Sequence, residues 1–521
     1  MLRRRPQGVA KVRLRGWDNL RPVLVALAIF VTGAGSYAQS AHPFTLPDSP
    51  RPLPPATAAL HPLSLPDIQR AMGHPDNALA GNPLSPAEEA VEPALTMLPH
   101  AEGARYWISG QANIIFQGRL PFHSPYEGTN SFRNSAEYKT SLVGTLYTAL
   151  RPTHSVRYST DFIFDMEAAG GRGLSQALGL AGFTNLDVVR NPNLGSTPYI
   201  ARYQIHQVIG LTSGTTTQDP NFFALAPEVP SRRLEFRIGK MTLPDFFDAN
   251  DIGSDSHLQF MIWTVDNNGA WDYAADTRGY TVGGMAEYDD RSWSLRYGLF
   301  AMPTVANGID MDWALSRAHG QNGELELRKS LLKQRKGTTR ILFYGNTAHM
   351  GVYREAVRAY LAGTDSTPSI VAHEHFGTLK YGAGYNTQQE ITDNLRVFGR
   401  FGWNEGQHES FAYTEVDQTV ELGGDYFLRR AHRAEDKVGA VFVSNAIKRD
   451  HQNYLAVGGL GFLLGDGRLN YGRENIVEGY YTLHAWRGMF YSLDVQHIDD
   501  PGYNRDRGPA WVGSVRGHVD F

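Results

Sequence analysis

The chain ends in WVGSVRGHVDF, residues 511–521, where apolar or small residues alternate with a second set of side chains. The first set is Trp511, Gly513, Val515, Gly517, Val519 and Phe521, and the second is Val512, Ser514, Arg516, His518 and Asp520. Successive side chains of a β-strand point to opposite sides, so a period of two puts the two sets on opposite faces. The stretch therefore predicts a strand with one apolar and one largely polar face.

The same alternation recurs upstream of this strand. Candidate strands follow one another at residues 105–117, 138–150, 155–166, 201–211, 232–241, 278–289, 291–301, 321–333, 338–350, 376–387, 394–404, 417–428, 436–446, 474–485, 487–497 and 510–521. An even number of strands is required of a barrel whose termini lie on one side of a membrane, and these candidates number sixteen. A barrel of this size encloses water, whereas eight strands leave a lumen filled by side chains. Residues 325–332 also suit a helix, so the candidate strand at residues 321–333 stays undecided.

Alternation alone fits both a secreted β-sandwich and a transmembrane barrel. Three features favour the barrel. Trp293, Trp403 and Trp511 lie near the ends of their runs, where interfacial aromatic girdles occur. Arg and Asp share the faces opposite the apolar ones, as a water-filled lumen allows, and Phe521 ends the last strand like a barrel-assembly signal. The predicted fold is all-β, a transmembrane antiparallel β-barrel of about sixteen strands.

The N-terminal residues predict export. Basic residues are frequent up to Arg21, an apolar run extends from Val23 to about Thr32, and Ser36-Tyr37-Ala38 follows. This order is typical of a secretory signal peptide, here residues 1–38 with cleavage after Ala38. Together with the barrel, it predicts location in a bacterial outer membrane.

Residues 39–104 have a different composition from the rest of the chain. Between Ala41 and His100 lie 13 of the 28 prolines. Because proline interrupts sheet pairing, this region is predicted to be a periplasmic extension or linker. The barrel domain is accordingly expected at residues 105–521.

Composition excludes several functions. The chain has no Cys, which removes disulfides, thiolate metal sites and cysteine catalysis. Its formal net charge of −4 argues against a nucleic-acid partner. The run from Asp248 resembles a calcium loop, but Gln259 stands where a bidentate Glu is needed. No cofactor or metal is therefore expected.

One long segment interrupts the strand rhythm between the fifth and sixth candidate strands. It includes Asp266-Asn267-Asn268-Gly269-Ala270-Trp271-Asp272-Tyr273-Ala274-Ala275-Asp276-Thr277-Arg278-Gly279-Tyr280. This run, with Asn504-Arg505-Asp506-Arg507-Gly508-Pro509 before the last strand, resembles the carbohydrate-selective outer-membrane porins of the OprB type. The resemblance covers roughly residues 105–521. It implies a sixteen-stranded barrel that passes sugars by diffusion, without enzymatic activity.

The chemistry of the segment suits an inward-folded loop that narrows a sugar channel. Carboxylates and amides exchange hydrogen bonds with sugar hydroxyls, and aromatic faces stack on sugar rings. Arginines of the barrel wall would face the loop acids and create a transverse field. The candidate constriction and sugar-contacting residues are Asp248, Asp251, Trp263, Asp266, Asn267, Asn268, Trp271, Asp272 and Asp276 of the loop, with Arg237, Arg296 and Arg400 of the wall. The alternative is that these side chains only hold the loop against the wall.

Other functions stay open at this stage. A general, non-selective porin shares the architecture, and an outer-membrane barrel hydrolase is a further alternative. Expected partners are small carbohydrates, outer-membrane lipid and lipopolysaccharide, and the barrel-assembly machinery through Phe521. The sequence does not distinguish a monomer from a homotrimer.

Overall fold

A computed structural model describes residues 94–98, 100, 103–188, 196–332, 334–412, 414–429 and 433–521. The expected signal peptide, and residues 39–93 of the expected linker, lie outside the described residues. Within these described ranges, no helix combines the length and the apolar character needed to cross a membrane.

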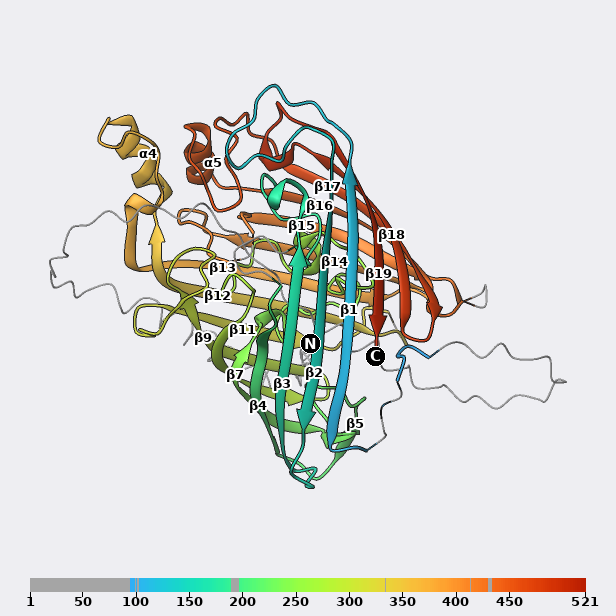
Figure 1. The fold of residues 1–521 in the computed structure, drawn as a ribbon. Coiled ribbons are helices and arrows are strands. Elements are labelled where there is room, and N and C mark those ends of the chain that lie inside the picture. Colours follow the sequence, from blue (N-terminus) through green and yellow to red (C-terminus); the bar gives the residue numbers. More distant parts are fainter. Residues whose placement is uncertain are drawn as a thin grey trace, which may run out of the picture. The chain divides into compact units, whose positions relative to one another are not determined.

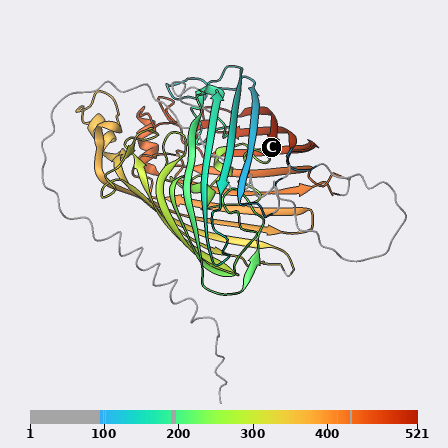
Figure 2. The same cartoon turned by 60° about the horizontal axis from the view of Figure 1, so that its bottom comes forward.

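Sixteen long strands form one antiparallel sheet. They are β1 (Tyr106–Arg119), β2 (Glu137–Leu150), β3 (Tyr158–Gly171), β4 (Tyr199–Gly210), β7 (Arg232–Met241), β8 (Thr281–Asp290), β9 (Trp293–Pro303), β11 (His319–Leu327), β12 (Gly337–Gly351), β13 (Glu374–Glu390), β14 (Leu395–Asn404), β15 (Gln418–Phe427), β16 (Lys437–Ala446), β17 (Glu474–Trp486), β18 (Met489–Asp499) and β19 (Ala510–Asp520). Each pairs with the next, and β1 pairs with β19, so the sheet closes into a barrel. Blue β1 and red β19 lie side by side in Figures 1 and 2.

The remaining elements are short. β10 (Met311–Asp312) pairs antiparallel with the end of β9, and β5 (Thr215–Thr217) pairs with β6 (Glu228–Pro230) in a separate sheet. The helices are η1 (Leu174–Gln176), η2 (Leu243–Asp245), α3 (Trp263–Asp266), α4 (Tyr353–Leu361), η3 (Val371–His373), α5 (Arg449–Ala456) and η5 (Pro501–Tyr503). Helices α4 and α5 are neighbours (Figure 1). An ion pair joins them, with Arg354 Nη2 2.9 Å from Asp450 Oδ2.

The two ends of the barrel differ in their connections. At one end, called here the short-turn end, β8 and β9 are joined by residues 291–292, and β17 and β18 by residues 487–488. The opposite end, called the long-loop end, carries the connection of residues 242–280 between β7 and β8, and the connections that contain α4 and α5. This asymmetry is typical of outer-membrane barrels.

The apolar side chains face outward. Phe401 is 49% exposed and its neighbour Arg400 only 2%, while Trp511 and Val515 are exposed and Arg516 is buried. A soluble sandwich would place these apolar side chains inside, because burying them is its main source of stability. The outward apolar face and the closed ring together confirm the predicted barrel.

Strand boundaries differ from the sequence prediction in a few places. β3 begins at Tyr158 and continues to Gly171, because Ala168–Gly171 pair with β2 although they lack a bulky alternating pattern. Residues 319–327 form a strand, so the helical alternative for residues 325–332 was wrong for Leu325–Leu327. The β5–β6 pair was not predicted, since its short arms carry no periodic signal.

Candidate pore constriction

Residues 242–280, called here the constriction segment, connect the fifth and sixth strands of the barrel. Nearly every side chain of the segment is buried. Its contacts are with inward-facing residues of strands on several sides of the barrel, for example Asn322 of β11, Asn386 of β13 and Arg516 of β19. The segment therefore occupies the lumen.

Arg400 of β14 binds groups from two parts of the constriction segment. Its Nε lies 3.1 Å from Oδ2 of Asp248, and its Nη2 donates to the carbonyls of Asp248 and Asp266 at 3.1 and 3.2 Å. Its Nη1 lies 3.3 Å from Oε2 of Glu421 on the neighbouring strand β15. This guanidinium is completely buried, so its partners must compensate the cost of desolvating the charge.

Asp248 turns the chain at the beginning of the segment. Its φ of +55° is a left-handed conformation, which Asp adopts more readily than most residues. Its carboxylate accepts hydrogen bonds from the Asn268 backbone at 2.8 Å and from Asn386 Nδ2 at 3.0 Å. Its own N–H donates to Glu324 Oε2 at 2.6 Å. Asp248 thus links the two halves of the segment and the wall.

The next three polar candidates bond to the wall or to a neighbouring residue. Gln388 Nε2 of β13 donates to Oδ2 of the partly exposed Asp251 at 2.6 Å. Asn267 Nδ2 donates to Oδ2 of its neighbour Asp266 at 2.5 Å. Asn268 Nδ2 donates to the Phe401 carbonyl at 3.1 Å, which ties the segment to β14.

Both tryptophans of the segment are buried and hydrogen-bonded. Trp263 Nε1 donates to the Asn185 carbonyl at 3.0 Å, and its ring contacts Phe183 with centroids 3.9 Å apart. Trp271 Nε1 donates to Asn322 Oδ1 at 2.9 Å. In this structure the two indoles pack the segment against its surroundings.

The last two acidic candidates, Asp272 and Asp276, accept hydrogen bonds from different parts of the chain. Asp272 accepts backbone hydrogen bonds from Phe411 and Ala412, both at 2.9 Å, and lies 3.5 Å from Lys380 Nζ. It therefore joins the constriction segment to the connection of residues 405–417. Asp276 accepts from backbone N–H groups of its own turn, at residues 278 and 280.

Two wall arginines have partners other than the expected loop carboxylates. Arg296 of β9 pairs with three wall residues, Glu287, Glu324 and Glu326, at 2.9, 2.8 and 3.1 Å. It reaches the segment through the Phe246 carbonyl, which accepts its Nη1 at 2.7 Å. The wall thus supplies much of the negative charge that the sequence analysis assigned to the loop.

Arg237 of β7 also bonds elsewhere than to a loop carboxylate. Its Nη1 donates to the Phe223 carbonyl at 3.1 Å, in the connection between β4 and β7. Its Nη2 lies 3.9 Å from Oε2 of Glu235, a carboxylate of its own strand. The guanidinium also lies 4.7 Å from the ring centroid of Phe246.

Sequence reasoning missed several wall partners and one inward connection. Glu324, Asn386 and Glu421 occupy lumen-facing strand positions, so strand parity was the signal that could have found them. The connection after β3 also enters the lumen, where the Phe183 carbonyl accepts the Trp263 N–H at 3.0 Å. That connection has no motif that distinguishes it from an outer loop.

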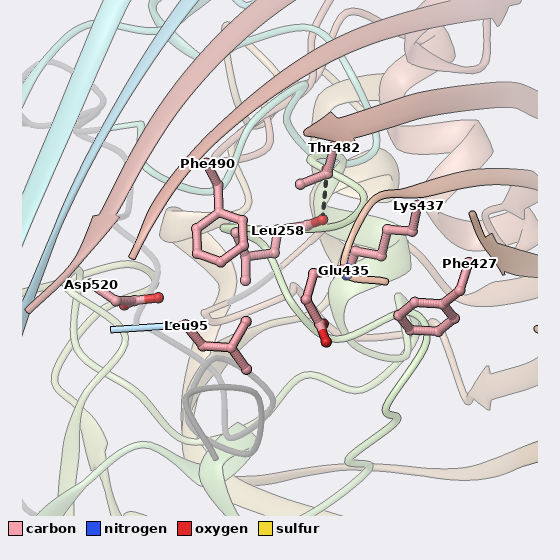
Figure 3. A pocket seen from close by; sticks show the side chains of 8 residues that line it. All are labelled: Leu95, Leu258, Phe427, Glu435, Lys437, Thr482, Phe490 and Asp520. Carbon is pink, nitrogen blue, oxygen red and sulfur yellow. Dashed lines mark hydrogen bonds between the residues drawn. The ribbon is translucent and has the colours of Figure 1, made fainter. Parts of the chain in front are cut away.

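A pocket lies at the short-turn end (Figure 3). Leu95, which precedes the barrel, points toward Leu258 of the constriction segment. Strand residues Thr482 and Phe490 lie on another side, and Thr482 Oγ1 donates to the Leu258 carbonyl at 2.9 Å. The Met97 N–H donates to the Asp520 carbonyl at 2.9 Å, which holds this stretch beside β19.

The long-loop end contains a buried histidine with two carboxylates. In α5, His451 Nε2 lies 3.5 Å from Glu415 and its Nδ1 3.4 Å from Asp417, while its ring stacks on Tyr353 of α4. Burial by itself lowers the pKa of His451, but the two carboxylates outweigh burial and raise the pKa to about 9. The imidazolium therefore bridges α4, α5 and the connection of residues 405–417.

This histidine predicts a pH dependence of stability. Below the ordinary pKa of 6.5 both folded and unfolded chains hold the proton, and the stabilisation is fully present. It is lost as the pH rises through the folded value of about 9. We expect the unfolding temperature in detergent to fall over this range, and to fall less in His451→Gln. Equal slopes for the two proteins would contradict the bridge.

Comparison with known proteins identifies the family. The family described as carbohydrate-selective porin, OprB family, matches residues 152–521. The chain belongs to the OprB family. As a member of that family with a closed barrel, it is a carbohydrate-selective porin, and family and fold imply a channel in the outer membrane rather than an enzyme. No curated protein matches this chain.

Two solved structures are similar to this OprB-family chain. The high-pH structure of OprB from Pseudomonas putida is 15% identical, with a TM-score of 0.60 over 80% of this chain and 94% of that chain. The outer membrane channel DcaP of Acinetobacter baumannii is 9% identical, with a TM-score of 0.43 over 80% of this chain and 97% of that chain. At these identities, the P. putida structure supports the common fold and nothing finer.

Proposed function

We propose that sugars diffuse passively through the lumen, past a constriction that the segment of residues 242–280 builds with the charged wall. The observation that carries this proposal is the opposition of Arg400 and Arg296 to carboxylates inside a barrel with an apolar exterior. Opposed charges create a transverse field, which orders water and disfavours apolar solutes. Sugars keep exchanging hydrogen bonds in such a field, because each hydroxyl both donates and accepts.

The twelve candidate residues would divide between two roles. Fully buried and fully bonded groups such as Asp248, Asp272 and Trp271 would hold the segment and fix the direction of the field. Asp251 is partly exposed, and its carboxylate accepts a hydrogen bond from Gln388, so it is the better candidate for direct contact with a sugar. Other polar groups of the lumen would also contact sugars when the segment moves.

The experiment compares currents and fluxes in the purified full-length protein. In planar bilayers, we expect stable conductance steps that added glucose or an oligosaccharide reduces. In liposomes, we expect faster swelling with sugars than with amino acids of similar size. Equal rates would favour the general porin, and the absence of conductance steps would reject both porins.

We also propose how the chain reaches the outer membrane and how it is oriented there. The chain would reach the outer membrane after cleavage behind Ala38, with the short-turn end toward the periplasm and lipopolysaccharide around the opposite rim. Phe521 would guide assembly, consistent with its reciprocal backbone hydrogen bonds to Gly110 of β1, at 2.7 and 2.8 Å across the seam. Blue native gels of the purified protein would separate a monomer from a homotrimer.

A further inference from the structure

The connection between β4 and β7, residues 211–231, is unusual for the short-turn end. Its last residue lies beside the two-residue turn of β8–β9, where Arg291 Nη2 donates to Ser231 Oγ at 3.5 Å. Its strands β5 and β6 pair only with each other and not with the barrel sheet. We call residues 211–231 the hairpin arm.

The tip of the arm is a tight turn of Asn221, Phe222, Phe223 and Ala224. The backbones of Asn221 and Ala224 exchange hydrogen bonds at 3.0 and 3.1 Å, and Asn221 Oδ1 accepts the N–H groups of Phe223 and Ala224. The turn places two adjacent phenylalanines at the tip, which are 1% and 2% exposed. Two buried aromatic rings at the tip of a polar turn must pack against another part of the protein.

That surface is the inner wall near the short-turn end. The Phe222 ring stacks on Tyr147 of β2, with centroids 4.2 Å apart. The Phe223 carbonyl accepts Arg237 Nη1 at 3.1 Å, and the Leu225 N–H donates to Asp161 Oδ2 at 3.4 Å. The arm therefore folds back into the lumen instead of extending away from the barrel.

Inside the lumen the arm meets the constriction segment. The rings of Phe223 and Phe246 are 5.4 Å apart in an edge-to-face arrangement. Phe246 directly follows η2, in the part of the segment that leaves β7 at the long-loop end. Arg202 lies 5.5 Å from the Phe223 ring. Two connections from opposite ends of the barrel thus touch through aromatic rings beside guanidinium groups.

We propose that the hairpin arm is a second constriction, which acts with the segment of residues 242–280 to set the size of sugar that passes. The proposal rests on the proposed sugar flux. Rings beside arginines and carboxylates suit a pyranose, which has apolar faces and a rim of hydroxyls. A sugar must part Phe223 from Phe246, and the arm can give way without breaking any ladder bond of the barrel. The largest sugars need the widest opening, so they are slowed most.

The test removes the two rings and leaves the barrel sheet unchanged. We expect Phe222→Ala with Phe223→Ala to raise single-channel conductance, and to speed liposome swelling more for a trisaccharide than for glucose. The matched control is Thr215→Ala with Thr216→Ala, which alters exposed side chains of the same arm and should leave both readouts at the wild-type level. An unchanged conductance and an unchanged order of sugar rates in the double phenylalanine variant would overturn the proposal.

Two further measurements keep the result interpretable. If the alanine variant fails to show heat-modifiable gel mobility, Phe222→Leu with Phe223→Leu keeps the apolar volume and removes only the flat rings. This variant should show the same trend, and wild-type fluxes in it would reject the arm as a constriction. Wild-type protein without sugar flux would instead reject the proposed function, so the two failures are distinct.

Discussion

Replacing Arg400 with Met is expected to destabilise the protein strongly and to release the constriction segment. The substitution leaves the carboxylates of Asp248 and Glu421 buried without their cation, and removes donors to the carbonyls of Asp248 and Asp266. Removing one partner of a buried ion pair typically costs about 3–5 kcal/mol. We expect a lower unfolding temperature in detergent, and larger, noisier single-channel currents.

A matched exposed pair provides the control. Arg232 and Asp290 form an ion pair of 2.9 Å on neighbouring strands, but the Arg232 side chain is 55% exposed. Exposed pairs typically contribute about 0–1 kcal/mol, so Arg232→Met should leave stability and current nearly unchanged. Adding Asp248→Asn and Glu421→Gln to Arg400→Met should recover part of the stability. Equal effects of the two Arg variants would show that Arg400 does not organise the segment.

Replacing Asp272 with Ala is expected to have the second largest effect. The backbone N–H groups of Phe411 and Ala412 would lose their acceptor, and the buried ammonium of Lys380 its nearest carboxylate. A hydrogen bond to a charged group contributes about 1.5–3 kcal/mol, so the constriction segment should part from residues 405–417. We expect higher conductance together with a lower unfolding temperature.

The paired readouts distinguish a structural role from contact with sugar. Asp251→Ala is the matched control, because Asp251 is partly exposed and its carboxylate accepts its hydrogen bond from the Gln388 side chain. It should keep the unfolding temperature and weaken the block of current by sugar. If Asp272→Ala instead weakens sugar block without any loss of stability, Asp272 contacts solute and its structural assignment here is wrong.

The sequence was informative about the barrel because strand parity is a local property. In residues 511–521, the alternation alone separates Trp511 and Val515 from Ser514 and Arg516, and the structure exposes the first pair and buries the second. Parity also placed Arg400 on the lumen face. It did not identify Glu421 as its partner, because the pairing of β14 with β15 depends on a register that no single strand encodes.

The side-chain partners in the candidate site were harder to predict from the sequence. The motif from Asp266 to Tyr280 marked the right segment, but the partner of each side chain comes from distant parts of the chain, as with Asp272 and Phe411. Arg296 was expected to face loop acids, and its carboxylate partners are residues of the wall. These pairs follow from strand register, which sets Glu287 of β8 and Glu324 of β11 directly opposite Arg296 of β9.

By itself, the sequence determined strands with one apolar and one polar face, and a long polar segment between the fifth and sixth of them, because side-chain alternation and composition are local properties. The tryptophans near strand ends, the final Phe521 and the family motifs favoured a closed barrel over a sandwich. The tertiary structure alone decided what fills the lumen. Whether Phe223 reaches Phe246, or Asp248 reaches Arg400, depends on how loops fold back inside a ring of sixteen strands. Such contacts form only when buried charges and rings find partners across the closed barrel, and no local pattern specifies them.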